Sequence, residues 1–177
     1  MTADELAAAV GREAANELAS ALGKIKHCLG QLSAEQVWWR SHPSLNSIGN
    51  LILHLCGNAR QWIVAGVGGA PDTRDRASEF AQRDPIGREA LLTRLAETLD
   101  EVDGRLAELE RALVAGGSDA PLQRVCMPQG FVQTVLDAVF HVVEHFSYHT
   151  GQIVLLAKWH VGARIRLYDD IRLNLGS

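Results

Sequence analysis

Four long segments of the chain carry apolar residues three and four positions apart, and almost no stretch alternates apolar with polar residues. This spacing places apolar side chains on one face of an α-helix, whereas a half-buried strand requires alternation. The pattern predicts helices over about residues 3–31, 46–65, 85–112 and 131–160. Because each helix has one apolar face to bury, we expect an all-α four-helix bundle.

Capping residues and helix breakers support these boundaries. Ser33 and Gln36 resemble a capping box just after the first helix. Asn46 or Ser47 is the expected N-cap of the second helix, and the glycines of "GVGG" suit its end. The pair Asp84 and Pro85 indicates the start of the third helix. Two long connections therefore join the helices.

The first connection, residues 70–85, is polar, and the second, residues 116–130, is expected to hold a short extended piece around Val125. The tail 163–177 shows no period, and we expect loop or short turns there. A chain of 177 residues with 47% apolar and 21% charged residues suits a single domain over 1–177.

Charge and hydropathy exclude several classes of function. The net charge is −4, with acids and bases interspersed, so neither nucleic acid nor an anionic membrane surface is an expected partner. The first segment has acids where a secretory signal has bases, and the longest apolar run, "IVLLA", is too short to cross a bilayer. We expect a cytoplasmic protein in which Cys28, Cys56 and Cys126 are reduced, at least two packed as small apolar groups.

The stretch "HVVEHFSYHTGQI" places His141, His145 and His149 four residues apart on the last helix. Two imidazoles one turn apart can bind the same ion, as in HExxH zinc sites, whereas a third on the same helix diverges. The pairs 141/145 and 145/149 satisfy this geometry equally well. His145 belongs to both pairs.

A third imidazole is available from the second helix, because His54 interrupts the apolar face of "NLILHLCGN". A histidine in such a dry setting needs partners for both ring nitrogens, either hydrogen bonds or a metal. Antiparallel packing of the second and last helices would bring His54 opposite the pair. Three neutral imidazoles leave coordination positions open, which is typical of a catalytic metal site.

The segments "NSIGNLILHLCGN" and "HVVEHFSYHTGQI" resemble the two signature helices of the DinB-like (YfiT-like) superfamily of bacterial four-helix bundles. The family pattern combines N-L-x-x-H-L-x-G-N with a late H-x-x-x-H-x-G-Q. It is matched here by Asn50, Leu51, His54, Leu55, Gly57 and Asn58, and then by His145, His149, Gly151 and Gln152. The resemblance covers most of the chain.

The resemblance implies that His54, His145 and His149 bind a divalent metal, nickel or zinc first and iron or manganese next. It selects the pair 145/149 over 141/145. Relatives include S-transferases and isomerases that use low-molecular-weight thiols, and homodimers are common among them. A small-molecule substrate and a small thiol are therefore the implied partners, while the catalytic residues stay unassigned.

Other residues near the motifs have a functional and a structural interpretation. We favour a hydrogen-bonded wall position for His141 over a fourth ligand, and a surface position for Glu144 over a general base. Asn50 either orients His54 or belongs to the helix start, and Gln152 is equally ambiguous. The remaining expectations are structural. We expect Trp38, Trp39 and Tyr148 to pack at core edges, and His27, His42 and His160 to be exposed or in loops. Gly57 and Gly151 are expected at close helix contacts, and Cys56 is expected to lie away from the metal site.

Three functions remain as hypotheses. The first is a metal-dependent enzyme, a thiol S-transferase or a hydrolase, because a divalent ion on three imidazoles lowers the pKa of bound thiol or water. The second is a non-catalytic metal- or ligand-binding bundle of a stress response. The third, a helical dimerisation module, predicts no metal.

Overall fold

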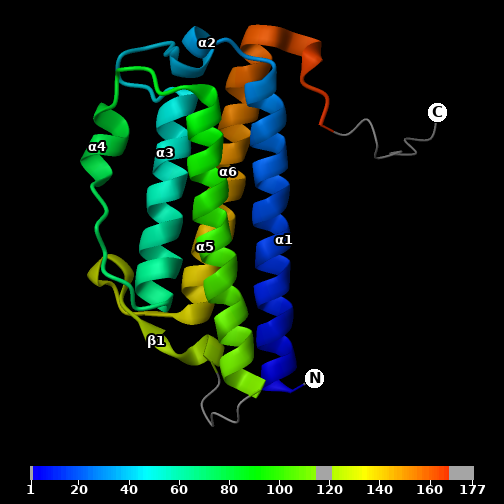
Figure 1. Cartoon of the computed structure of the whole chain (residues 1–177), viewed down its shortest axis with the longest axis vertical. Coiled ribbons are helices and arrows are strands. Elements are labelled where there is room, and N and C mark those ends of the chain that lie inside the picture. Colours follow the sequence, from blue (N-terminus) through cyan, green and yellow to red (C-terminus); the bar gives the residue numbers. More distant parts are fainter. Residues whose placement is uncertain (1, 115–120, 168–177) are drawn as a thin grey trace, which may run out of the picture.

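The computed structural model describes residues 2–114 and 121–167. The long helices lie side by side along the long axis of the molecule (Figure 1). They are α1 (Ala3–Gly30), α3 (Ile48–Ala59, continued by a π-helix over Arg60–Val67), α5 (Arg88–Val114) and α6 (Val135–Val161). The all-α bundle predicted from the apolar spacing is confirmed.

The long connections decide the topology of the bundle. The segment 68–87 passes outside α3, carries the short helix α4 (Arg76–Ala81), and returns to the end where α3 began (Figure 1). As a result α3 and α5 are parallel, and both run opposite to α1 and α6. Helix α1 contacts α5 and α6, and α3 contacts the same two helices from the other side.

Several boundaries follow from local capping. Ser47 is the N-cap of α3, and its hydroxyl accepts a hydrogen bond from the backbone N–H of Asn50. Ser33 and Gln36 form the predicted capping box, which starts the five-residue helix α2 (Ala34–Trp38). The predicted N-terminus at residue 85 was wrong, because α5 begins at Arg88.

The start of α6 also differs from the prediction of residue 131. The extended piece predicted around Val125 is strand β1 (Val125–Cys126), and it pairs antiparallel with β2 (Gln133–Thr134). Thr134 then caps α6 through a reciprocal pair of hydrogen bonds with Asp137. The strand pairing therefore takes up the residues that the apolar pattern assigned to the helix.

Three short 3₁₀ turns complete the described chain: Pro121–Gln123, Pro128–Gly130 and Gly162–Arg164. The last of them agrees with the short turns expected in the tail, whose residues 168–177 lie outside the described part. In the described residues no helix combines the length and the hydropathy needed to cross a membrane.

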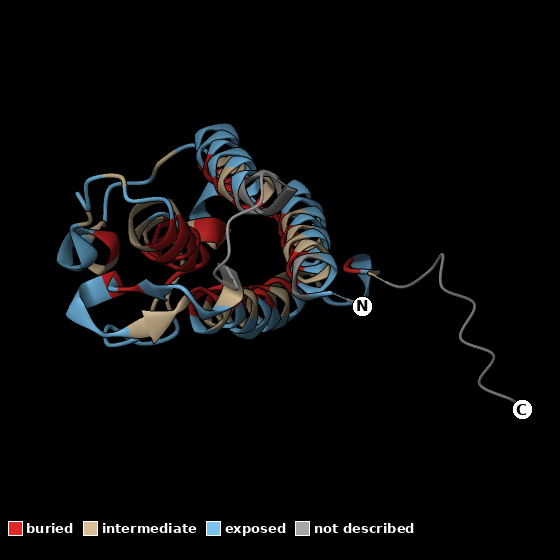
Figure 2. Cartoon of the chain, turned by 90° about the horizontal axis from the view of Figure 1, so that it is seen from below, coloured by how far each residue is buried: buried red, intermediate tan, exposed pale blue. Residues whose placement is uncertain are grey.

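The core fills the space between the four long helices (Figure 2), where the buried faces turn inward. Its fully buried side chains include Ile25, Leu55, Leu95, Phe146 and Ile153. All three cysteines are free and buried. Burial raises the pKa of Cys28 and of Cys56 to about 11, so both thiols are protonated at neutral pH.

Candidate metal centre

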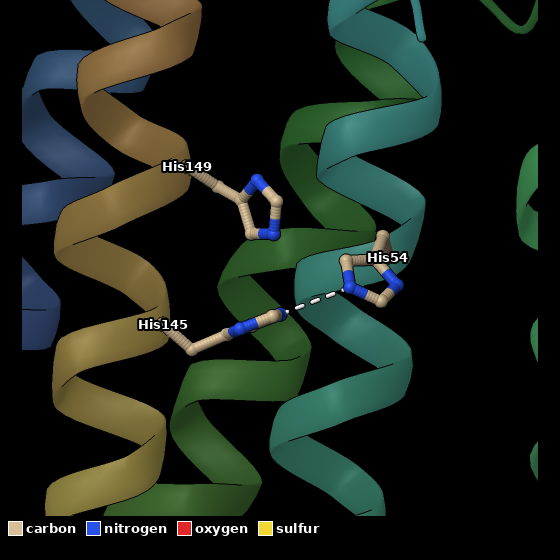
Figure 3. A group of neighbouring side chains, drawn as sticks. All are labelled: His54, His145 and His149. Atoms are coloured by element: carbon tan, nitrogen blue, oxygen red, sulfur yellow. Dashed lines mark hydrogen bonds between the residues drawn. The ribbon is translucent and has the colours of Figure 1, made fainter. Parts of the chain in front are cut away.

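The three histidines predicted as ligands meet between α3 and α6 (Figure 3). His54 Nε2 lies 3.0 Å from His145 Nε2. His149 completes the group, and one ring nitrogen from each residue lies within 4.8 Å of the others. The pair 145/149, which spacing alone did not distinguish from 141/145, is the one that joins His54.

Antiparallel packing of α3 and α6 produces this meeting. His54 faces His145 at 3.0 Å, and four residues further along α3 the amide nitrogen of Asn58 lies 3.1 Å from His141 Nε2. Moving four residues toward the C-terminus of α3 thus corresponds to moving four residues toward the N-terminus of α6. This register keeps one face of each helix in contact over successive turns.

The second ring nitrogen of His54 contacts a carboxylate from α4. Glu79 Oε2 lies 2.8 Å from His54 Nδ1, and Arg74 donates to both oxygens of this carboxylate at 2.7 and 2.9 Å. Because an ionised carboxylate only accepts, His54 Nδ1 carries the proton and donates it to Glu79. The lone pair of His54 is therefore on Nε2, which points toward α6.

The environment of Glu79 keeps it ionised although it is only 8% exposed. Burial raises its pKa, but the hydrogen bonds from His54 and Arg74 outweigh burial, and the net pKa lies below the ordinary value. Arg74 Nη2 also lies 3.0 Å from His54 Nδ1. Two donors face each other in that contact, so Glu79 is the group that holds them together.

A second polar partner orients His149. Its Nδ1 lies 2.7 Å from Gln152 Oε1, three residues further along α6. An amide oxygen accepts, so this contact places the proton on Nδ1 and leaves Nε2 free. The ambiguity at Gln152 is resolved, because its side chain fixes the tautomer of a candidate ligand.

The cluster favours neutral imidazoles. Burial, together with the neighbouring His149 and His54, lowers the pKa of His145 from 6.5 to about 3. Burial also lowers the pKa of His149. A metal ligand must be an unprotonated imidazole nitrogen, so these environments provide the required protonation state near neutral pH.

The donor set fits a tetrahedral divalent ion. With metal–nitrogen distances of about 2.0–2.1 Å, two ligand nitrogens on such an ion lie roughly 3.3 Å apart. The observed separations run from 3.0 Å for His54 and His145 up to a limit of 4.8 Å within the group. Small rotations of these side chains would bring the three nitrogens to the separations that such an ion requires. Imidazole ligands suit zinc, nickel, copper or iron.

His141 occupies the wall position that we favoured for it. It contacts Asn58, as described, and its ring stacks on Trp62 with centroids 3.8 Å apart. The His141 ring also lies parallel to that of His145, with centroids 5.4 Å apart. His141 therefore packs beside the cluster and is not part of the group of three converging histidines.

The structure also decides between the two interpretations of Asn50, which either orients His54 or belongs to the helix start. It is fully buried, completes the capping box with Ser47, and donates to the backbone oxygens of Glu79 and Gln82 at 2.8 and 3.2 Å. Arg40 donates to the oxygen of the same amide. Asn50 therefore belongs to the start of α3 and fastens α4 to it.

Position 57 of α3 requires a glycine, because the neighbouring ion pair leaves no room for a side chain. A Cβ at Gly57 would lie 1.9 Å from Glu79 Oε1 and 2.9 Å from Arg74 Nε. The expected close contact with another helix was wrong for Gly57, because the group that approaches it is the side-chain ion pair of Glu79 and Arg74. It was also wrong for Gly151, because a Cβ there would meet nothing within 4 Å among the described residues.

Most of the surrounding aromatic and charged residues are structural. Glu144 is exposed, as expected. The expected position of Tyr148 at a core edge was wrong, because this residue is 60% exposed, although its ring lies 5.1 Å from that of His149. Trp38 donates to the backbone oxygen of Ile86 at 3.0 Å, at the end of the bundle where α3 starts.

Three smaller expectations concern the remaining histidines and Cys56. His27 and His42 are exposed, as predicted. The interpretation of His160 as a solvent-facing or loop residue was wrong: it is half-buried in α6, and its ring meets the edge of Trp39 at 4.8 Å. Cys56 does not join the histidine group.

The contribution of α4 to the site was not predictable from the sequence pattern. Glu79 holds His54, and the ring of Phe80 lies 4.7 Å from that of His54 and covers it. The one signal available was that a histidine in an apolar face needs partners for both nitrogens. Nothing in the spacing of residues 70–85 selects Glu79 from the other acids of that segment.

The fold and the three-histidine cluster define the chain as an all-α helical bundle with a candidate metal centre. Residues 7–167 match a family described as a protein of unknown function (DUF1572), and the chain belongs to this family. No curated protein matches the chain.

Proposed function

We propose that this chain is a DinB-like metalloenzyme in which His54, His145 and His149 hold one divalent ion, nickel or zinc. The observation that carries the proposal is the convergence of three ring nitrogens within 4.8 Å, with the other nitrogens of His54 and His149 engaged by Glu79 and Gln152. Oriented ligands of this kind are typical of metal sites.

The reaction that this site supports best is transfer of a low-molecular-weight thiol to a small electrophile. Three protein ligands leave a coordination position for an outside molecule, and a divalent ion so held lowers the pKa of a thiol or water. The chain's own thiols are poor candidates for the nucleophile, since Cys28, Cys56 and Cys126 are buried and burial raises the pKa of each thiol. The reactive thiol is therefore a separate molecule.

The residues around the cluster define the approach to it. Phe80 covers His54, which is 5% exposed, so water is excluded from that side. His145 and His149 are half-buried, and the exposed Tyr148 stands beside His149. A small substrate would approach from this side of α6. Hydrolysis by the same ion is the second reaction that the site supports.

A homodimer is part of the proposal. Helix α6 exposes Phe140, Leu155 and Trp159, each more than 60% exposed, and their spacing puts them on one face. An exposed apolar stripe of this kind is typical of an interface. Light scattering of the full chain tests it, with Trp159→Glu expected to shift the mass from dimer to monomer.

The activity test uses protein loaded with nickel or zinc, glutathione and cysteine as thiols, and 1-chloro-2,4-dinitrobenzene as the electrophile. We expect metal-dependent conjugation that His145→Ala reduces to the uncatalysed rate. His27→Ala is the matched control, because His27 is exposed on α1. Ester cleavage without thiol would instead identify a hydrolase. Bound metal without turnover of either kind would favour the non-catalytic, stress-response bundle.

A further inference from the structure

A pocket of about 330 Å³ lies beside α3, outside the histidine cluster. Residues of α3 and the π-helix, of the segment 71–79 and of α5 form its wall, and no residue of α6 contributes. The converging nitrogens of the three histidines, in contrast, lie between α3 and α6. The pocket is therefore a separate concavity, which Arg74, Glu79 and Gly57 connect to the surroundings of His54.

The floor of this pocket is preorganised. The side chain of Arg74 is 4% exposed, and its nitrogens donate to both oxygens of Glu79 and, at 2.8 Å, to Gln61 Oε1. These three hydrogen bonds engage each nitrogen of the guanidinium, and the Glu79 carboxylate compensates its charge. The Arg74 and Glu79 pair therefore gives the pocket its shape and leaves recognition to other side chains.

The charges on the rim are not all compensated. Arg60 pairs with Glu101 at 2.5 Å, and Asp75 accepts from two backbone N–H groups at the start of α4. Arg94, which is exposed, has no ion pair within the described residues. Asp72 accepts from the Gln61 amide at 2.7 Å and from a backbone N–H, but from no cationic side chain of the described chain.

One cation, Arg94, and two carboxylates, Asp72 and Asp75, thus lack an oppositely charged partner among the described side chains at the edges of the same concavity. The rest of the wall is mixed: Leu53, Val64, Ala65 and Pro71 are apolar, whereas Gln61, Thr73 and Ser78 are polar. A ligand that matches this lining carries a carboxylate, an ammonium group and a short aliphatic part. The combination is that of an apolar α-amino acid.

We propose that this pocket binds an apolar α-amino acid as its zwitterion. Arg94 binds the carboxylate, for which the planar guanidinium is suited, and Asp72 binds the ammonium group. Leu53, Val64 and Ala65 contact the aliphatic side chain. The volume of about 330 Å³ accommodates a residue of the size of leucine or methionine.

Calorimetric titration of the full chain with L-valine, L-leucine and L-methionine tests the proposal. We expect at least one of them to bind with a Kd of about 1 mM or tighter. Two analogues of leucine isolate the charges: 4-methylpentanoate lacks the ammonium group, and isoamylamine lacks the carboxylate. Each should bind at least about tenfold more weakly, as expected for the loss of one charged contact.

Variants assign the contacts. Arg94→Gln and Asp72→Asn should each weaken binding about tenfold or more. Arg105→Gln, on the same helix but outside the pocket lining, should bind like wild type. Absence of binding by all three amino acids, or equal affinity of wild type and Arg94→Gln, would overturn the proposal. Repeating the titration after treatment with a chelator makes the result independent of the proposed metal.

Discussion

Glu79 Oε2 lies 2.8 Å from His54 Nδ1, although the two residues are 25 positions apart and belong to helices of very different length. This contact joins a six-residue helix outside the bundle to a histidine inside it. It fixes which nitrogen of His54 bears the proton and turns the other toward His145. The long connection between α3 and α5 is therefore part of the site.

Loss of the Glu79 charge should weaken metal binding. In Glu79→Gln the amide still accepts from His54, but the negative charge and its bidentate pairing with Arg74 are lost. Partners that orient a ligand typically contribute about 10–100-fold to metal affinity, and we expect a decrease within that range. Competition with a chromophoric chelator measures the affinity. Glu144→Gln, which changes an exposed carboxylate beside His145, is the control, and equal affinities would contradict the assigned role.

Alanine at Gly57 should destabilise the fold and disturb the site together. Its Cβ would overlap Glu79 Oε1, which the hydrogen bonds from Arg74 hold in place. We expect a loss of about 1–3 kcal/mol in the free energy of unfolding, the usual cost of overpacking, measured by urea denaturation. Gly151→Ala provides the contrast, because nothing lies within 4 Å and alanine favours the helix by about 0.5–1 kcal/mol. Similar effects of the two substitutions would refute this explanation.

The metal-free protein should lose stability as the pH falls. The pKa of His145 is lowered from 6.5 to about 3 in the folded chain. Between these values the unfolded chain binds a proton at this position that the folded chain does not, so the free energy of unfolding decreases as pH is lowered below about 6.5. The midpoints of urea denaturation at about pH 7 and pH 5 measure the slope of the unfolding free energy against pH. In His145→Gln this slope should be smaller; an unchanged slope would rule out His145 as its source.

The sequence was sufficient to predict the four long helices and to identify the three histidines that converge. Long apolar repeats define α1, α3, α5 and α6, because a stripe of three or four turns has few alternative explanations. His54 was recognisable as a polar residue in an apolar face. The choice of His149 over His141 came from the family resemblance, and the packing of α3 against α6 provides its physical reason: His141 is held by Asn58 and Trp62.

Two kinds of feature were beyond the reach of sequence patterns. Helix α4 has six residues, too few to show a helical period, so the segment containing Glu79 read as a polar connection. The role of Gly57 depends on an ion pair that arrives from that segment. Both are contacts between segments distant in sequence, and only the packed chain defines them.

The central claim is that α3 and α6 hold one cation between them, and elemental analysis of purified protein tests it most directly. Wild type and His27→Ala should each contain about one divalent ion per chain, because three imidazoles form one site. His145→Ala should contain almost none, since it removes the nitrogen that lies 3.0 Å from His54 Nε2. Equal metal content in wild type and His145→Ala would contradict the account.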